Sequence, residues 1–299
     1  MQKNNIQIYT ILNPFVLIST EYNFKREIFK NIKKISLLYD FIPLIYKKGY
    51  LNSKIFLNGY NSMVRKLKNM DHLLAISATT KIDAIKLGFK PNKITVISCG
   101  VESCFRKNKC NILELEKFGI SKKYILSVVG PGDYRKNVPT LIKSFKNLNN
   151  FIKEKYQLVI VGGLEFFNTK EYLNDKDFKE KKIIFTKEVT KEDLIKLYNC
   201  AELFVFIPLY EGFGIPVLEA LACCKTVITS NTSALNEFPS EIVYKVNPKN
   251  IEEISENISK ILLNPLLKIK NIPKGLEYAK NFTWEKVSKK ITDVYNHLL

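Results

Sequence analysis

Two glutamates, Glu211 and Glu219, stand eight positions apart in the stretch "YEGFGIPVLEALACC". Glu219 falls among apolar residues near the start of a predicted helix, where an unpaired charge is costly to bury. Hydroxyl groups of a polyol ligand can donate hydrogen bonds to such carboxylates and offset part of that cost without a cation. Gly212 and Gly214 would let backbone amides approach the same ligand closely. The spacing therefore indicates a site for a ligand that is rich in hydroxyls.

A second group of candidate residues lies in "GPGDYRKN", residues 130–137, directly after a predicted strand. Arg135 and Lys136 are adjacent cations, and Asn137 is the expected cap of the helix that follows. The free backbone amides at a helix N-terminus favour an anion. A second helix is expected to begin at Pro216, after "PLYEGFG". Two helix N-termini and a cation pair together suit a diphosphate.

The second half of the sequence alternates apolar strand patterns with amphipathic helix patterns. Continuous apolar strands separated by helices are typical of a parallel sheet covered on both faces, which predicts a doubly wound α/β domain. Ligands bind outside the carboxyl ends of such strands, so the loops that carry the candidate residues are expected to line one crevice. The predicted strands are 124–130, 157–163, 183–186, 203–207 and 226–230, and the predicted helices are 137–148, one from Thr190, one from Pro216 and 250–264.

The first hundred residues show the same alternation less cleanly. A helix over 79–87 is expected to stop at Gly88. The polar, broken stretch between Gly100 and Lys123 is the expected domain boundary. We therefore predict two domains, a shorter one over residues 1–105 and a second over 106–299 that includes the C-terminal helix. The strand candidates in the first domain are 6–12, 35–39, 73–76 and 94–98.

The charge of the chain is strongly positive, with a formal net charge of +18 at pH 7. Only four of the 47 basic residues are arginine, and the lysines are spread along the whole chain. Surfaces that read nucleic acid cluster their charge and use arginine for bidentate base contacts, so nucleic acid is not the expected partner. A general attraction to anionic membrane surfaces is compatible with this composition.

The cysteines and histidines do not have the spacing of a metal site. The six cysteines include no CxxC pair, and there are two histidines, so no metal is expected. Three of the cysteines lie in or beside apolar segments, which suggests reduced, buried thiols in a cytosolic protein. No signal peptide is expected, and the longest apolar runs, such as "LFVFIPL", are too short to span a bilayer.

Taken singly, each of these signals has a commoner explanation. Glu219 alone is more often a partly exposed helix residue paired with a lysine. Arg135 and Lys136 alone are more often a solvated turn, and the glycines at 130 and 132 can be a turn without a ligand. Their joint placement at successive strand ends favours a ligand site over these explanations.

These segments resemble a known family. "YILSVVGPGDYRKNVPTLIKSF", "LVIVGG", "VTKEDLIKLYNCAELFVFIPLYEGFGIPVLEALACCKTVITSNTSALNEF" and "GLEYAKNFTWEKV" are similar to the donor-binding domain of retaining glycosyltransferases of family 4. "LLYDFIPLIYKKGYL" and "MDHLLAISATTKIDAIKLGFKPNKITVISCGV" resemble the later part of its acceptor domain. The resemblance covers nearly the whole chain and implies the GT-B fold, two Rossmann-like domains that face a cleft.

The resemblance also implies an activity and roles for single residues. It implies transfer of a hexose from a nucleotide sugar to a glycan or lipid-linked acceptor with retention of configuration, in cell-surface polysaccharide biosynthesis and without a metal or other cofactor. The catalytic residues implied are Arg135 and Lys136, which neutralise the diphosphate, and Glu211, which holds the transferred sugar. The donor-binding residues implied are Gly130, Gly132, Gly212, Phe213, Gly214, Ile215, Leu218 and Glu219, the last on the ribose hydroxyls. Tyr39, Asp40 and Glu237 are implied as acceptor-side or sugar contacts.

The chain departs from the family pattern in three places. Tyr39-Asp40 stands where many members have His-Asp, and tyrosine does not titrate near neutrality as histidine does. Cys224 and Thr226 stand where the family usually has Gly and Pro after "EALAC". We expect the front domain to be short and to lack the family's opening strand and glycine-rich loop.

Two other functions are compatible with parts of the pattern. The short front domain leaves open a nucleotide-binding subunit or fragment that needs a complementary chain for activity. A nicotinamide-dependent oxidoreductase shares the fold class, but Arg135 stands where the third glycine of the dinucleotide fingerprint belongs. For the glycosyltransferase that the resemblance implies, we expect a cytoplasmic location, with peripheral association at the inner face of the membrane.

Overall fold

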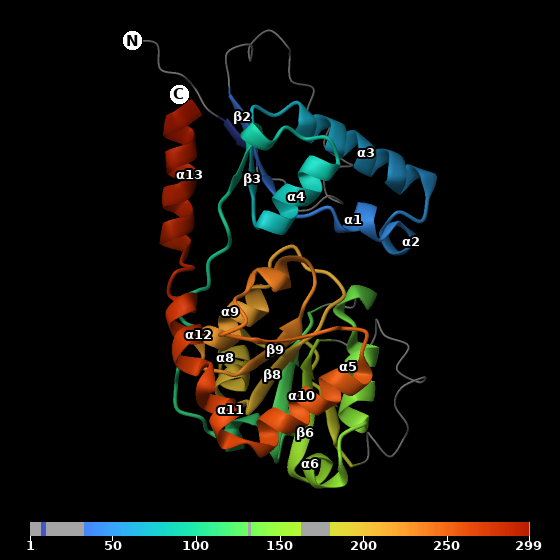
Figure 1. Ribbon diagram of the computed structural model, residues 1–299, viewed down its shortest axis with the longest axis vertical. Helices are drawn as coiled ribbons and strands as arrows, with labels where there is room; N and C mark the ends of the chain where they lie inside the picture. The colour runs from blue at the N-terminus through green and yellow to red at the C-terminus, as the bar shows by residue number, and fades with distance from the viewer. Residues whose placement is uncertain (1–6, 10–32, 131–132, 163–179, 299) are drawn as a thin grey trace. The chain divides into compact units, whose positions relative to one another are not determined.

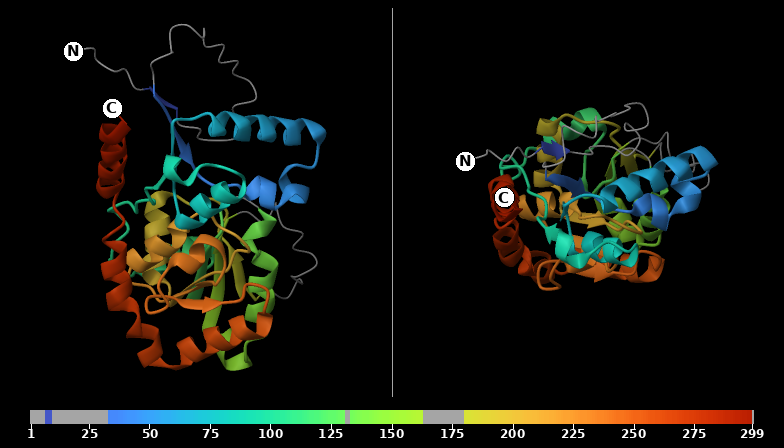
Figure 2. Two further views of the ribbon diagram at one scale, coloured as in Figure 1. Left: turned by 45° about the horizontal axis from the view of Figure 1, so that its top comes forward. Right: turned by 90° about the horizontal axis from the view of Figure 1, so that it is seen from above.

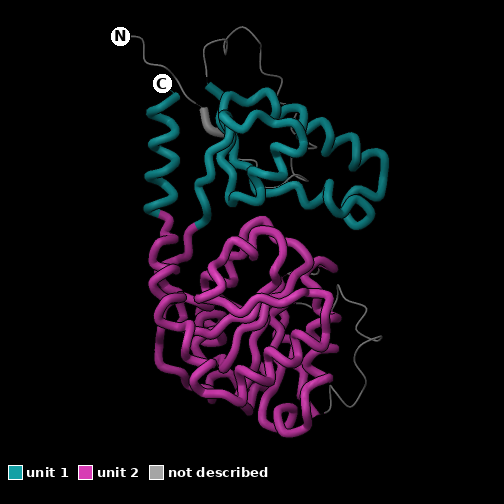
Figure 3. Tube along the Cα trace, viewed as in Figure 1, with its two compact units in different colours: residues 1–99, 285–299 teal, residues 100–284 magenta. Residues whose placement is uncertain are grey.

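In the computed structural model, residues 7–9, 33–130, 133–162 and 180–298 are described. The chain divides into two compact units (Figure 3). Unit 1 consists of residues 1–99 and 285–299, and unit 2 of residues 100–284. Each unit is built on its own parallel sheet, as predicted for an α/β protein.

The division corrects the predicted boundaries. Unit 2 begins at Gly100 rather than after residue 105. The last helix, predicted to belong to the second domain, belongs to unit 1 from Glu285 onward (Figure 3). The reason is its apolar side: Val287 packs in one cluster with Ile35 and Leu74 of the sheet of unit 1.

The described residues of unit 2 form six parallel strands in the order β10-β9-β8-β5-β6-β7. The central strands are buried along most of their length, which is why they read as continuous apolar runs. Their bounds are β5 Lys123–Val128, β6 Tyr156–Val161, β7 Ile183–Phe185, β8 Leu203–Phe206, β9 Val227–Ser230 and β10 Tyr244–Val246.

Helices cover both faces of this sheet, each over its own apolar cluster (Figure 1). One face carries α5 (Val138–Lys146), α6 (Asn150–Lys155) and α10 (Ile251–Leu263), and α5 (green) and α10 (orange) keep together in two further views (Figure 2). The other face carries α8 (Lys191–Cys200), α9 (Ile215–Ala222) and α12 (Ile272–Ala279). The short α11 (Pro265–Lys270) follows α10.

In unit 1, the described strands form a parallel sheet in the order β1-β2-β3-β4. One face packs against α3 and α4 through Tyr60, Val64 and Ala84, and the other packs against α13. The strands are β1 Gln7–Tyr9, β2 Lys34–Leu38, β3 His72–Ala75 and β4 Ile94–Val96, and the helices are α1 Ile42–Ile45, α2 Lys47–Tyr50, α3 Lys54–Lys68, α4 Ala78–Lys86 and α13 Trp284–Leu298. In the described part of the chain, no helix is long and apolar enough to cross a bilayer.

The structure corrects part of the prediction that the cysteines are reduced, buried thiols. The structure joins Cys110 to Cys200 in a disulfide, so the expectation of reduced thiols does not hold for this pair. Cys99 and Cys223 are buried free thiols, and burial raises the pKa of each to about 12. The disulfide ties the segment before the 3₁₀ helix η3 (Ile112–Phe118) to the last residue of α8.

Cys224, which stands where the family usually has glycine, lies in the turn that ends α9. The Lys225 N–H donates to the Ala220 carbonyl at 2.9 Å and the Cys224 N–H to the Leu221 carbonyl at 3.0 Å, which is the Schellman pattern. The residue after the cap in this pattern is left-handed and is usually glycine. Cys224 takes this position with φ +57. The turn therefore keeps its shape, but a residue with a side chain bears the energetic penalty of a left-handed backbone.

We expect Cys224→Gly to stabilise the protein by about 0.5–1 kcal/mol, because relief of a left-handed penalty of ~1–2 kcal/mol exceeds the added chain entropy of glycine. Urea unfolding at neutral pH measures the change. Ala222→Gly, two residues earlier in the helical part of α9, is the matched control and should lose about 1 kcal/mol or more. A loss of stability in both variants would contradict this account of the turn.

Candidate functional site

The strand order of unit 2 creates a crevice at one place. From β5 the sheet continues to β6 on one side, and β8 lies on its other side. The connections that leave β5 and β8 at their carboxyl ends therefore run to opposite faces of the sheet, α5 on one and α9 on the other. A topological switch point of this kind is where open α/β sheets bind ligands. The candidate residues Arg135, Lys136 and Glu211 lie in the two loops that flank it.

Three of the predicted charged residues meet at this point. The Glu211 side chain is 12% exposed, and its carboxylate accepts from Lys136 Nζ at 2.7 Å. Arg135 Nη1 lies 3.0 Å from the same oxygen, Oε1. One buried carboxylate oxygen is thus shared by two cations from the loop after the neighbouring strand. Removing one member of such a cluster leaves a charge that is buried without compensation.

The two cations are held differently. Arg135 donates through Nε to Asp133 at 3.0 Å and through Nη1 to the Tyr210 carbonyl at 2.7 Å, so it joins the two loops. Its own carbonyl accepts from the Leu209 N–H at 2.8 Å. Lys136 Nζ lies 5.3 Å from the centre of the Phe206 ring, a cation–π contact. Since an ammonium carries three donors, Lys136 keeps donor capacity beyond its bond to Glu211.

Asn137 has a different role from the predicted one. It is the residue before α5, but its side chain makes no capping hydrogen bond and its backbone is left-handed, with φ +60. Its amide is buried and donates instead to the carbonyls of Ile207, at 3.0 Å, and Pro248, at 2.6 Å. Asn137 therefore fixes the loop after β5 to the exit of β8, which the helix-cap interpretation did not foresee.

A row of hydroxyls that sequence reasoning missed holds the segment that carries Glu211. They follow one another in "TSNTS", at the end of β9 and in the segment beyond it, and each is bonded to the backbone of the last residue of β8 or of the loop after it. The bonds are Thr229 Oγ1 to the Phe206 carbonyl at 2.9 Å, Ser230 Oγ to the Pro208 carbonyl at 2.6 Å, Thr232 Oγ1 to the Leu209 carbonyl at 3.2 Å, and the Glu211 N–H to Ser233 Oγ at 2.9 Å. The density of small hydroxyl residues at a strand exit was the signal available in the sequence.

The predicted donor-binding glycines differ in what they require. Gly130 has φ +66, and no described atom lies within 4 Å of where a Cβ would stand, so its left-handed backbone is what selects glycine. Gly214 has φ +115, and an added Cβ would meet Leu235 at 2.5 Å. Gly212 is buried, and Gly132 lies outside the described residues.

The apolar residues of the motif are also placed. Phe213 packs between the rings of Phe238 and Phe282, with centroid distances of 6.5 and 6.0 Å. Ile215 is exposed at the first position of α9. Leu218 is fully enclosed in the apolar cluster under α9, and its predicted contact with a donor stays a prediction.

Glu219 lies in α9 and has its own set of contacts. Its Oε2 accepts from the Tyr198 hydroxyl at 2.8 Å. Burial raises its pKa above the ordinary 4.5, against the lowering effect of that hydrogen bond. Within the described residues no lysine or arginine forms an ion pair with it, so the expectation for an isolated helix glutamate, pairing with a lysine, does not apply here. The structure thus brings three of the four predicted charged groups together and gives the fourth a neutral partner.

The remaining predicted contacts lie elsewhere. Tyr39 and Asp40 belong to unit 1, directly after β2. Asp40 Oδ1 accepts from the N–H of Ile42, the first residue of α1, at 2.9 Å. Tyr39 is 38% exposed, and partial burial raises its pKa. Glu237 is exposed at the end of the 3₁₀ helix Ser233–Glu237 in unit 2. Over the described ranges, no group of three or more His, Cys, Asp or Glu side chains could hold a metal ion.

Comparisons with known proteins identify the family of unit 2. Residues 113–281 match the family model described as glycosyl transferases group 1. The chain is 26% identical over 277 residues to a serotype-specific mannosyltransferase, WbdA, of Escherichia coli. This match covers 89% of the chain but 34% of WbdA, so the chain spans about a third of the length of this relative.

Solved structures show the same fold. A sucrose-phosphate synthase from Thermosynechococcus elongatus aligns with a TM-score of 0.76 at 19% identity, over 98% of this chain and 73% of that one. The Anabaena protein HepE, solved in complex with UDP-glucose, aligns with a TM-score of 0.73 at 14% identity, over 89% of this chain and 72% of that one. The fold is the GT-B fold that the sequence resemblance implied.

The raised pKa of Glu219 predicts a pH-dependent stability. Between the ordinary value of 4.5 and the higher folded value, the folded state binds more protons than the unfolded state, so the free energy of unfolding falls as pH rises. Glu219→Gln has no group to titrate and should lack this decline. We expect the variant to gain stability relative to the wild type as pH rises above about 4.5, as measured by urea unfolding in steps from pH 4 to 7.5. A stability difference that stays constant over this range would contradict the burial argument.

Proposed function

Because the chain belongs to the glycosyl transferases group 1 family, we propose that it is a glycosyltransferase that uses a nucleotide-sugar donor. In this proposal it moves a hexose to a glycan or lipid-linked acceptor with retention of configuration, in the biosynthesis of a cell-surface polysaccharide. The observation that carries the proposal is the cluster of Arg135, Lys136 and Glu211 at the switch point of the donor-side sheet.

The cluster suits a diphosphate leaving group. Asp133 and Glu211 balance Arg135 and Lys136 in the structure, so the cations are already oriented before a ligand arrives. The remaining N–H donors of Lys136 and the free amides at the start of α5 would bind the phosphate oxygens. As the bond from the anomeric carbon to the diphosphate oxygen breaks, negative charge grows on the diphosphate, and preorganised donors stabilise it most where water is excluded.

Glu211 would take the sugar end of the donor. Its carboxylate shares Oε1 with both cations, and its backbone N–H is fixed by Ser233. An acceptor hydroxyl would attack the anomeric carbon on the face that the leaving group vacates, forming the new glycosidic bond, while its proton passes to the departing diphosphate. Holding both partners in that geometry is where most of the rate would come from.

The relatives suggest which sugar donors to test first. WbdA is named a mannosyltransferase, and HepE was solved with UDP-glucose. Purified protein would be incubated with UDP-glucose, GDP-mannose and a panel of oligosaccharide and lipid-linked acceptors, with release of nucleoside diphosphate and the anomeric configuration of the product as readouts. Binding of a nucleoside diphosphate without turnover would favour the second candidate, a subunit that needs a complementary chain.

Lys136→Met is expected to weaken binding of the preferred nucleoside diphosphate about ten- to a hundredfold, since it removes one hydrogen bond between charged groups. Isothermal titration calorimetry measures the change. Lys274→Met, at an exposed position of α12, is the matched control because it removes the same charge from the same unit, and it should bind as the wild type does. Equal affinity in wild type and Lys136→Met would remove the diphosphate role from the cluster.

A further inference from the structure

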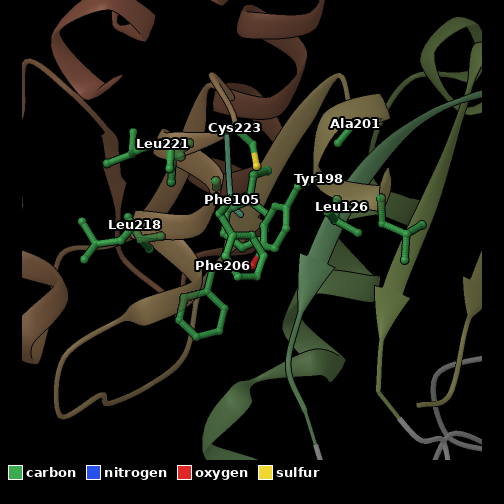
Figure 4. Close-up of a cluster of buried hydrophobic side chains, with 14 of the residues drawn as sticks. Phe105, Leu126, Tyr198, Ala201, Phe206, Leu218, Leu221 and Cys223 are labelled. Atoms are coloured by element: carbon green, nitrogen blue, oxygen red, sulfur yellow. The ribbon is translucent and has the colours of Figure 1, made fainter. Parts of the chain in front are cut away.

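Tyr198 is wholly enclosed, and its hydroxyl is directed to one carboxylate. The side chain has no exposed surface, and Oη lies 2.8 Å from Glu219 Oε2. Figure 4 shows Tyr198 next to Phe105 within the apolar cluster. A tyrosine hydroxyl in such a place needs a hydrogen-bond partner, and here the partner is a predicted ligand-binding residue.

The ring cannot shift easily, because aromatic neighbours pack on it. The Phe105 ring meets it edge-on at 5.8 Å with an interplanar angle of 84°, and the Phe204 ring lies at 5.4 Å. In a closely packed interior a displacement of the ring would require these neighbours to move as well.

The helix turn that carries Tyr198 is also fixed from outside. Asn199 Oδ1 accepts from the Asn108 N–H at 2.7 Å, and its Nδ2 donates to the Arg106 carbonyl at 3.1 Å. Cys200, the next residue, is joined to Cys110 by the disulfide. Three successive residues of α8 therefore hold Glu219 on one side and the segment 106–110 on the other.

This arrangement leaves Glu219 half satisfied. Its Oε2 accepts from Tyr198, and no described residue donates to Oε1. The Tyr198 hydroxyl has a single proton, and its other neighbour, the Pro216 carbonyl, lies at the longer distance of 3.4 Å. Glu219 is partly exposed, and a carboxylate oxygen with no protein donor has capacity for a ligand hydroxyl.

We propose that Tyr198 is a positioning residue for recognition of the ribose of the donor: its hydroxyl holds one oxygen of Glu219, so that the other oxygen is presented to a ribose hydroxyl. The inference rests on the proposed function, since it assumes a nucleotide donor. Without the Tyr198 hydroxyl, the Glu219 carboxylate can rotate. The site then loses the fixed acceptor oxygen that distinguishes a ribose from a dideoxyribose.

The chain offers a matched control for a buried tyrosine hydroxyl. Tyr124 lies in the same apolar cluster, has no exposed surface, and donates through its hydroxyl to the Leu197 carbonyl at 2.6 Å. Tyr124→Phe removes a buried hydrogen bond to the same helix without touching Glu219. A merely structural role for Tyr198 predicts that Tyr198→Phe and Tyr124→Phe behave alike.

The experiment compares the affinities for a nucleoside diphosphate and its 2′,3′-dideoxy analogue, measured by isothermal titration calorimetry on the full chain. The wild type should prefer the ribose form about ten- to a hundredfold, the range expected for hydrogen bonds to a charged group. Tyr198→Phe should reduce this preference to about threefold or less and leave the affinity for the dideoxy analogue unchanged. Tyr124→Phe should keep the preference of the wild type.

An unchanged preference in Tyr198→Phe would overturn the inference. Should that variant not accumulate as folded protein, Phe105→Leu loosens the edge contact on the Tyr198 ring while its hydroxyl remains, and a preference equal to that of the wild type would then count against the inference. A wild type that binds both nucleotides equally would remove Glu219 from ribose recognition and the inference with it. A wild type that binds neither would instead refute the proposed function.

Discussion

The rest of unit 2 is arranged around one ionic contact, the Glu211 carboxylate shared by Arg135 and Lys136 between the exits of β5 and β8. These charges can lie below the surface only because they compensate one another at distances of 3.0 and 2.7 Å. The strand order brings the two loops together, the buried amide of Asn137 ties them, and the hydroxyls after β9 fix the Glu211 segment from the other side. The sheet thus holds the side chains of Arg135, Lys136 and Glu211 in fixed positions relative to one another.

The two glutamates of the motif, Glu211 and Glu219, differ in what compensates their partly buried charge. Glu211 is compensated by cations, while Glu219 receives a hydrogen bond from a neutral hydroxyl. A cation beside Glu219 would compete with a ligand for the carboxylate, whereas a hydroxyl occupies one oxygen and leaves the charge in place. Burial raises the pKa of Glu219, so a site of this kind keeps a carboxylate ready for neutral hydroxyl donors at the expense of some folding stability. The charged and the neutral environment would suit the charged and the neutral parts of a nucleotide sugar, respectively.

Local patterns in the sequence were sufficient to predict β5 to β9 of unit 2, the start of α9 near Pro216 and the loops that carry Arg135 and Glu211. They could not predict which side chains meet across the sheet, since Tyr198 and Glu219 pair through the packing of two helices over one face. Asn137 was read as a cap because its position fits one, but a left-handed backbone turns its amide toward the exit of β8. The strand β10 and the helix α3 were not predicted, and the C-terminal helix was assigned to the wrong unit because an amphipathic pattern does not say which sheet it will cover. Gly132 lies outside the described residues, and the roles of the site residues stay predictions.

The assignment of α13 to unit 1 bears on how the polypeptide matures on the ribosome. One face of the sheet of unit 1, with Ile35, Leu74 and Ile97, is covered by a helix that is translated after the whole of residues 100–284. At typical elongation rates of ~5–20 residues per second, this face waits roughly ten to forty seconds for its cover. Nascent chains in that interval expose apolar surface of the kind that chaperones bind, so the order of synthesis completes unit 1 only after unit 2 has been translated.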